Sequence, residues 1–256
     1  MPNLKIIWHN KFAPGSFTKL QSMMVQFCEN LMKIFQVNML SRFQSLESLV
    51  VEDSGSVQEI FELQEQEVTE TRAVTVTQLK ELFMHRLPKL KRVWNKDPEG
   101  TFSFPNLQKI SVWECESLKS LFPTSVARCL KQLEDLRIVE CGIEEIIEQE
   151  EGAKEDARFV FPKLTLLILR QLPKLKWFYR RVHTSEWPLL KTLEVSGSNE
   201  IQIFASKEFR TEEPDEQSRL ETSIQQPLFL VEEVSDKWYN INYRRFLSKK
   251  KNWSQI

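Results

Sequence analysis

The sequence predicts a solenoid in which short parallel strands stack into one sheet, and three features of the chain support this prediction. An apolar pattern recurs along the chain, prolines precede several copies of it, and aromatic residues follow the copies in register. The pattern is clearest in residues 107–122, LQKISVWECESLKSLF, and residues 20–35 repeat it as LQSMMVQFCENLMKIF. Both segments fit L-x-x-L-x-L-x-x-C/N-x-x-L followed by an apolar pair, which is the pattern of a leucine-rich repeat.

Seven copies of this pattern can be aligned. They begin at Leu20, Leu46, Leu79, Leu107, Leu133, Leu164 and Leu190. The intervals are 26, 33, 28, 26, 31 and 26 residues, and the two longest exceed the usual repeat length of about 20 to 29 residues, so they contain insertions. Residues 2–8 match the second half of a repeat, and we therefore expect the chain to start inside one.

The spacing within each copy predicts its shape. The last two apolar residues of L-x-x-L-x-L lie two apart, so both face the core from a short strand while the residues beside them face outward. One repeat cannot bury its apolar side alone, and neighbouring repeats supply the rest of the core. The predicted fold is an α/β leucine-rich-repeat solenoid with a curved, concave parallel sheet and an irregular or short helical convex side.

Small and aromatic residues at fixed positions fit this core. Cys28, Cys115 and Cys141 follow their strands at the position where the repeat carries Asn or Cys, and we expect buried packing there rather than a metal or redox role. The aromatic residues expected in the core are Phe35, Phe61, Trp94, Phe122, Phe178 and Phe204. Pro105, Pro162 and Pro188 favour an extended backbone at the start of their repeats.

The outward positions of the strands predict a partner-binding concave face that contains several apolar side chains. The candidate contact residues are Met24, Val50, Phe83, His85, Lys109, Trp113, Arg137, Val139, Ile168 and Arg170. Contiguous exposed apolar area marks an interaction site, and Trp113 is the first residue to test because Trp dominates interface energetics. The alternative is that these side chains pack on each other or on a tail.

Two acidic segments, residues 59–70 and 144–156, fall in the long intervals, and we expect them on loops. Such charge runs are usually solvated, and a basic partner surface is the alternative.

Composition and missing motifs exclude several classes of function. Lys plus Arg (35) nearly balance Asp plus Glu (36), which argues against nucleic-acid binding. No apolar run is long enough for a membrane span. The sequence contains no phosphate-binding loop, no metal-ligand spacing and no catalytic motif. We therefore expect no enzyme, no cofactor, no metal and no small-molecule substrate.

Three recurring phrases indicate a family. They are the C-E-x-L-K-x-[IL]-F turns, the L-P-K-L-K segments at 87–91 and 172–176, and the F-P-x-L starts at 104–107 and 161–164. With them, residues 1 to about 207 resemble the C-terminal leucine-rich repeats of plant nucleotide-binding disease-resistance proteins of the coiled-coil class. The resemblance implies a cytoplasmic receptor region that senses a pathogen effector or a guarded host protein and regulates a nucleotide-binding module. This chain itself lacks that module's phosphate loop.

The predicted organisation is a repeat domain at 1–207, a polar linker at 208–226 and an aberrant basic tail at 227–256, with disorder as one reading of the tail. Two other functions stay open. One is a stand-alone repeat adaptor that presents substrates to a ubiquitin ligase, and the other is a truncated, non-functional receptor fragment.

Overall fold

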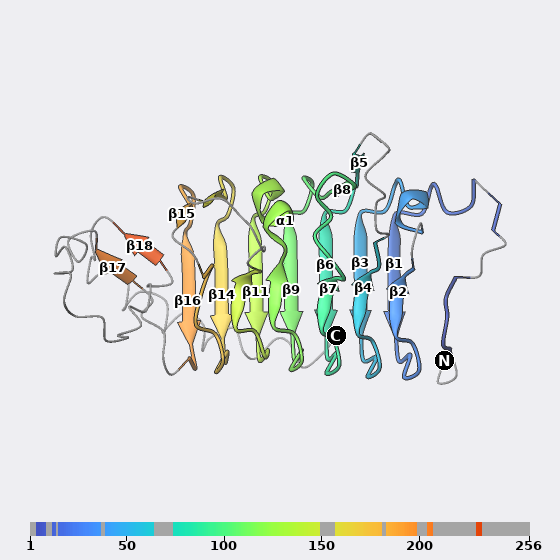
Figure 1. Cartoon of the computed structure of the whole chain (residues 1–256), viewed down its shortest axis with the longest axis horizontal. Helices are drawn as coiled ribbons and strands as arrows, with labels where there is room; N and C mark the ends of the chain where they lie inside the picture. The colour runs from blue at the N-terminus through green and yellow to red at the C-terminus, as the bar shows by residue number, and fades with distance from the viewer. Residues whose placement is uncertain are drawn as a thin grey trace, which may run out of the picture. The chain divides into compact units, whose positions relative to one another are not determined.

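The computed structural model describes residues 4–8, 12–13, 15–36, 39–63, 74–148, 157–180, 183–198, 204–206 and 229–231. The chain forms two compact units, residues 1–201 and residues 202–256. The first unit is a parallel β-solenoid, so the fold class that the repeats predict is confirmed (Figure 1).

A seven-stranded parallel sheet forms the front of the first unit. Its strands, in spatial order, are β1 (Ser22–Gln26), β3 (Ser48–Glu52), β6 (Glu81–His85), β9 (Lys109–Trp113), β11 (Asp135–Val139), β14 (Leu166–Arg170) and β16 (Thr192–Ser196). Each pairs residue for residue with the next, so that Ser22 lies beside Ser48 and Ser48 beside Glu81. All seven strands coincide with the L-x-L segments of the seven predicted repeats.

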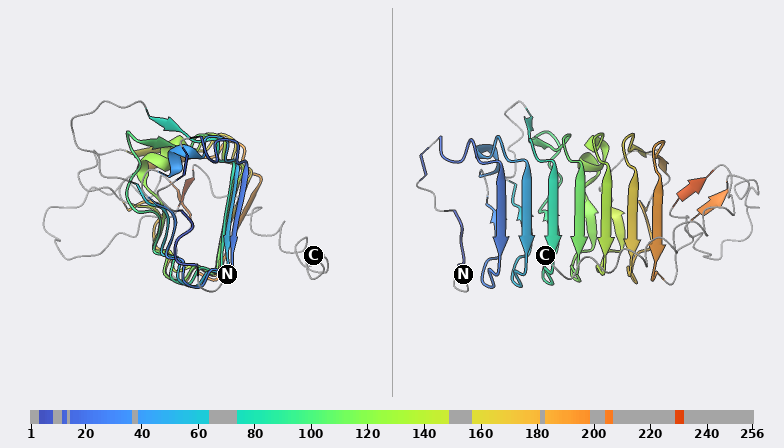
Figure 2. Two further views of the ribbon diagram at one scale, coloured as in Figure 1. Left: turned by 90° about the vertical axis from the view of Figure 1, so that its right-hand side faces the viewer. Right: turned by 180° about the vertical axis from the view of Figure 1, so that it is seen from behind.

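The back of the solenoid carries shorter parallel ladders, seen opposite the front strands in Figure 2. One ladder consists of β2 (Lys33–Phe35), β4 (Glu59–Phe61) and β7 (Arg92–Trp94), and another of β10 (Ser120–Phe122) and β12 (Glu145–Ile147). The back is therefore more regular than the irregular surface that the sequence predicts. The loop assignment of the two acidic segments is also wrong at their starts, because Glu59 lies in β4 and Glu145 in β12. Two consecutive buried apolar residues, Ile60 and Phe61 in β4 and Ile146 and Ile147 in β12, hold these starts in strands.

Short elements connect front and back. They are the paired strands β5 (Thr75–Val76) and β8 (Phe102–Ser103), the paired strands β13 (Ala157–Val160) and β15 (His183–Glu186), the 3-10 turn η1 (Leu40–Arg42) and the helix α1 (Thr124–Cys129).

The core lies between the front and back strands. The inward residues of the front strands from β3 to β14 are almost completely buried; Ile110 is 1% exposed and Val112 0%. On the back, aromatic rings stack from repeat to repeat. The centroids of Phe35 and Phe61 are 5.4 Å apart, and those of Phe61 and Trp94 are 5.7 Å apart. Each repeat thus completes the core of its neighbour, as expected for a solenoid.

The second unit contains β17 (Phe204–Ser206), which pairs in parallel with β18 (Phe229–Val231). The predicted linker at 208–226 lies outside the described residues, and so does the predicted tail at 227–256 apart from β18. The side chain of Phe204 also lies outside the described part of the chain.

Candidate protein-recognition face

The outward side chains of the seven front strands form one continuous surface, which we call the front face. It consists of the first, third and fifth residue of each strand, because side chains alternate along a strand. In β9, for example, Lys109 and Trp113 are exposed and Ser111 is half-buried, while the two residues between them face the core. In-register pairing turns these positions into three columns that run across the sheet.

All ten candidate residues lie on the front face. Lys109 lies in the first column. The middle column contains Met24, Val50, Phe83, Arg137 and Ile168. The third column contains His85, Trp113, Val139 and Arg170. Met24 is 60% exposed and Trp113 43% exposed, and the other apolar members are half-buried. Their position is as the repeats predict, and their role in binding stays a prediction.

An uncharged aromatic patch occupies the middle of this face. The ring of His85 lies edge-on to both Phe83 and Trp113, at centroid distances of 6.2 and 6.1 Å. Its Nε2 is 3.1 Å from the hydroxyl of Ser111. Burial is the main cause that lowers the pKa of His85 below its ordinary value of 6.5, so the ring is neutral at neutral pH. This patch presents an exposed indole supported by a neutral imidazole.

The basic candidates on the front face are already held by carboxylates. Arg137 contacts Asp135 through two parallel hydrogen bonds of 2.8 and 2.7 Å. Lys109 lies 3.1 Å from Glu81, and Arg170 Nε donates to Glu194 at 2.9 Å. Pairing on the same face fixes where these side chains point, although exposed pairs of this kind contribute only about 0 to 1 kcal/mol each.

The sequence analysis missed one charged pair, which lies at the corner where the front strands end. Arg86 donates two hydrogen bonds to Asp53, of 2.6 and 2.7 Å, and this pairing raises the pKa of Arg86 and lowers that of Asp53. Both residues directly follow a front strand. The signal that could have found them is this shared repeat position, one residue beyond the fifth strand residue.

That corner position has an unusual backbone. The residue after each front strand has a positive φ, and in six of the seven repeats it is not glycine. They are Phe27, Asp53, Arg86, Glu114, Glu140 and Gln171, with φ between 49° and 54°, followed by Gly197. From this conformation the amide of Arg86 reaches the carbonyl of Trp113 at 2.8 Å. The left-handed turn ends each strand. In five of the repeats, at Asp53, Arg86, Glu114, Glu140 and Gln171, it prolongs the ladder by one bond.

The cysteines that follow the corner are buried, as expected. The Sγ of Cys115 lies 3.5 Å from the carbonyl of Trp113, and that of Cys141 lies 3.1 Å from the carbonyl of Val139. The hydrogen bond with Cys141, with burial in addition, raises the pKa of Cys115. The burial of all three thiols supports a packing role. Among the described residues, no group of three or more His, Cys, Asp or Glu side chains could hold a metal ion.

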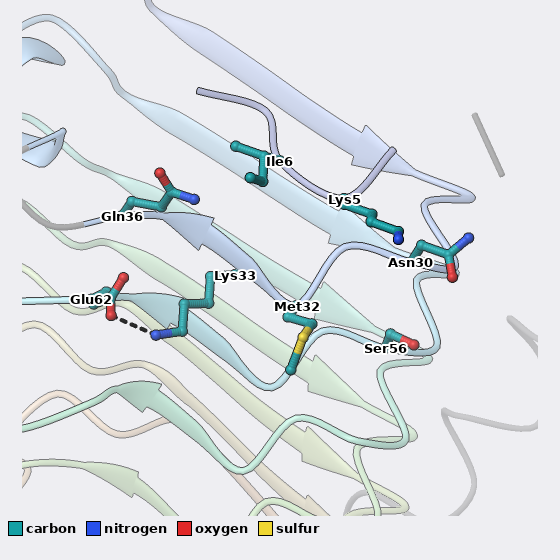
Figure 3. Close-up of a pocket in the computed structure, with 8 residues that line it drawn as sticks. All are labelled: Lys5, Ile6, Asn30, Met32, Lys33, Gln36, Ser56 and Glu62. Carbon is teal, nitrogen blue, oxygen red and sulfur yellow. Dashed lines mark hydrogen bonds and ion pairs between the residues drawn. The ribbon is translucent and has the colours of Figure 1, made fainter. Parts of the chain in front are cut away.

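A pocket of about 620 Å³ lies at the N-terminal end of the solenoid (Figure 3). Its lining residues are Lys5, Ile6, Asn30, Met32, Lys33, Gln36, Ser56 and Glu62. Lys33 lies 3.6 Å from Glu59 and also contacts Glu62, and the hydrogen bond with Glu62 is the main cause that raises its pKa. The lining contains no histidine or cysteine.

In the described part of the chain, no helix has the length and apolar character needed to cross a membrane.

Comparison with known proteins gives one match. A family model described as plant disease resistance protein RPS2-like, leucine-rich repeats, matches residues 1–142, which is more than half of the 256-residue chain. Neither the curated proteins nor the solved structures contain a match to this chain. Repeats of this family and this fold are typically recognition modules rather than enzymes. The chain belongs to the leucine-rich-repeat family of RPS2-like plant disease resistance proteins.

Proposed function

We propose that the chain is the sensor region of a plant immune receptor and that its front face binds a pathogen effector or a guarded host protein. The observation that carries the proposal is the separation of roles within each strand. The inward side chains complete the core, so the outward row, with Met24 and Trp113 exposed, is not needed to hold the repeats together. Exposed apolar side chains that adjoin one another across several strands are typical of interaction surfaces.

The proposed mechanism has a second part that rests on the family alone. Engagement of the front face would change how the repeats restrain a nucleotide-binding module, which this chain does not contain. We further propose that the chain acts in the cytoplasm. A fluorescent fusion in plant cells tests the location, and signal confined to the secretory pathway would contradict it.

The binding proposal can be tested by affinity capture with matched variants. Wild-type chain, the double variant Phe83→Ala/Trp113→Ala and a back-surface control, Lys119→Ala, are exposed to extracts of infected and uninfected leaves. Lys119 is exposed and lies away from the front strands. We expect at least one protein that wild type and Lys119→Ala retain and that the double variant loses. Identical retention by all three chains would contradict recognition by the front face.

The same capture separates the proposal from the adaptor alternative. Co-purified ubiquitin-ligase subunits that are unaffected by the front-face variant would favour an adaptor.

A further inference from the structure

Trp113 ends the middle strand of the front sheet and stays exposed although both neighbouring strands are in place. It is the last residue of β9, which lies between β6 and β11 (Figure 1). On the β6 side the ring of His85 lies edge-on to the indole at a centroid distance of 6.1 Å, and on the β11 side Val139 is the partner in register. The indole is nevertheless 43% exposed. The sheet therefore positions this ring without covering it.

Two carboxylates follow directly at the left-handed corner. Glu114 is the next residue after Trp113 and Glu140 the next after Val139, so they hold equivalent positions in adjacent repeats. Both have a φ of 54°, and the amide of Glu114 donates to the carbonyl of Val139 at 3.1 Å. Neighbouring strands of a sheet lie about 4.8 Å apart. The corner therefore carries two like charges side by side, next to an exposed indole.

Among the described residues, no basic side chain forms an ion pair with either of these carboxylates. Arg86, at the same corner of the preceding repeat, is held by two hydrogen bonds to Asp53, of 2.6 and 2.7 Å. Asp53 is the main cause of the raised pKa of Arg86, and Glu114 contributes least to it. On the other side, Arg170 Nε donates to Glu194 at 2.9 Å. The basic groups beside the corner are thus already bound to other carboxylates.

This arrangement costs the fold stability and favours a cation. Like charges at neighbouring positions of a sheet are destabilising, and a positive group between them would remove the repulsion. The face of an indole attracts the same kind of group through its π-electrons, and Trp is the strongest such partner. The neutral ring of His85 adds no positive charge that would repel it. The ring and the two carboxylates therefore select the same ligand chemistry.

We propose that the Trp113 corner, defined as Trp113, Glu114 and Glu140, binds a basic segment of the partner protein. An arginine or lysine side chain of that segment lies on the indole and contacts the two carboxylates. This inference rests on the proposed function, because it assigns a chemistry to the partner that the front face recognises. Charge complementarity selects the occupant. An acidic segment would meet like charges here, and a purely apolar one would bury carboxylates without a partner.

Matched peptides test this chemistry directly. The full chain is titrated with the acetylated peptides GSRGRSG and GSEGESG, and binding is followed by NMR through the indole N–H signal that the variant Trp113→Phe lacks. We expect only the arginine peptide to shift this signal, and Glu114→Gln/Glu140→Gln to weaken its binding by about tenfold or more. The control Glu99→Gln/Glu134→Gln removes the same charge from two exposed positions away from the corner and should bind as wild type does. Equal shifts with both peptides, equal weakening by both double variants, or no binding of the arginine peptide would overturn the proposal.

Two further measurements test the choice of a partner as the occupant. Replacing Lys249, Lys250 and Lys251 with serine should leave the affinity for the arginine peptide unchanged. Stronger binding by this variant would mean that the chain's own basic run competes with the peptide, and would overturn a partner as the occupant. A dimer that forms without peptide and that Glu114→Gln/Glu140→Gln breaks would overturn it as well, because the occupant would then be a second copy.

Affinity capture from leaf extracts separates this inference from the proposed function. A protein that both Phe83→Ala/Trp113→Ala and Glu114→Gln/Glu140→Gln lose is the result expected if both hold. Loss by the first variant alone would support recognition by the front face and overturn the basic contact. If the first variant loses nothing while the arginine peptide binds as expected, the proposed function fails and the charge preference of the Trp113 corner stands.

Discussion

The two faces of a single strand show how this molecule separates stability from recognition. In β9, Ile110 and Val112 point inward and are 1% and 0% exposed, while Trp113, the next residue, points outward and is 43% exposed. The inward residues contact the neighbouring repeats, whose own inward residues are equally buried. The outward residues line up with those of the neighbouring strands but cover no core.

Substitutions on the two faces should therefore have separable effects, on stability for the inward face and on recognition for the outward face. In a solenoid, stability is approximately a sum of repeat and nearest-neighbour contributions, so an inward defect damages at least two interfaces. An outward substitution removes contact area that is already partly in water. The front face can therefore vary in sequence without a large loss of stability.

The largest expected effect comes from placing a charge on the inward face. Ile110→Asp would bury an unpaired carboxylate between two repeats, and we expect a loss on the order of 5 kcal/mol in the free energy of unfolding. The outward control, Ser111→Asp, should cost less than about 1 kcal/mol. Urea denaturation followed by circular dichroism measures both. Similar midpoints for the two variants would refute the assignment of faces.

The second largest loss in the free energy of unfolding is expected from a cavity in the column of stacked aromatic rings on the back strands. Phe61 is fully buried and stacks against rings on both sides, so Phe61→Ala should cost about 3 to 4 kcal/mol. The control is Phe83→Ala, which removes the same side chain from the half-buried front face and should cost at most about 1 kcal/mol. If the two losses in denaturation free energy were equal, the back column would not be part of the core.

Glu145 is an exception to the rule that buried residues of the strands are apolar. It is an ionisable side chain on a back strand and is only 8% exposed. Burial raises its pKa above the ordinary 4.5, against the opposing effect of Arg180, whose Nε lies 2.9 Å away. The folded state therefore holds this proton more tightly than the unfolded state. Its contribution to stability falls as the pH rises from about 4.5 through the folded pKa.

The variant Glu145→Gln tests this sign. We expect it to gain stability relative to wild type as the pH is raised from 4 to 7, by less than either core substitution costs. Thermal melts across this range provide the measurement, and Glu144→Gln, at the half-buried neighbouring position, is the control. If Glu145→Gln instead gained stability relative to wild type as the pH is lowered, burial would not be the cause of the raised pKa of Glu145.

Much of this architecture was predictable because the repeat is local. Two apolar residues two apart, as at Ile110 and Val112, specify an inward face without knowledge of distant contacts. That is why all seven front strands and the outward position of all ten candidate residues follow from the sequence. The buried Cys115 and Cys141 follow from the same register.

The rest depends on contacts between repeats that no local pattern records. The β4 and β12 strands lie within acidic segments, and the charges of Glu59 and Glu145 obscure the strand conformation there, although the repeat pattern places Phe61 in the core. The Asp53–Arg86 pair joins residues 33 positions apart through a left-handed corner that non-glycine residues adopt. Binding by the front face is a property of a partner's surface, so the sequence identifies candidate residues and not the partner.

The smallest expected loss of stability, that of Trp113→Ala, tests most directly the claim that the front face is separate from the core. Val112→Ala and Trp113→Ala alter neighbouring residues on opposite faces of β9, and their unfolding free energies can be compared by urea denaturation under one condition. We expect Val112→Ala to lose about 2 kcal/mol and Trp113→Ala less than about 1 kcal/mol, although tryptophan is the much larger side chain. A loss for Trp113→Ala that equals or exceeds the loss for Val112→Ala would show that Trp113 belongs to the core, and the front face would not be a free recognition surface.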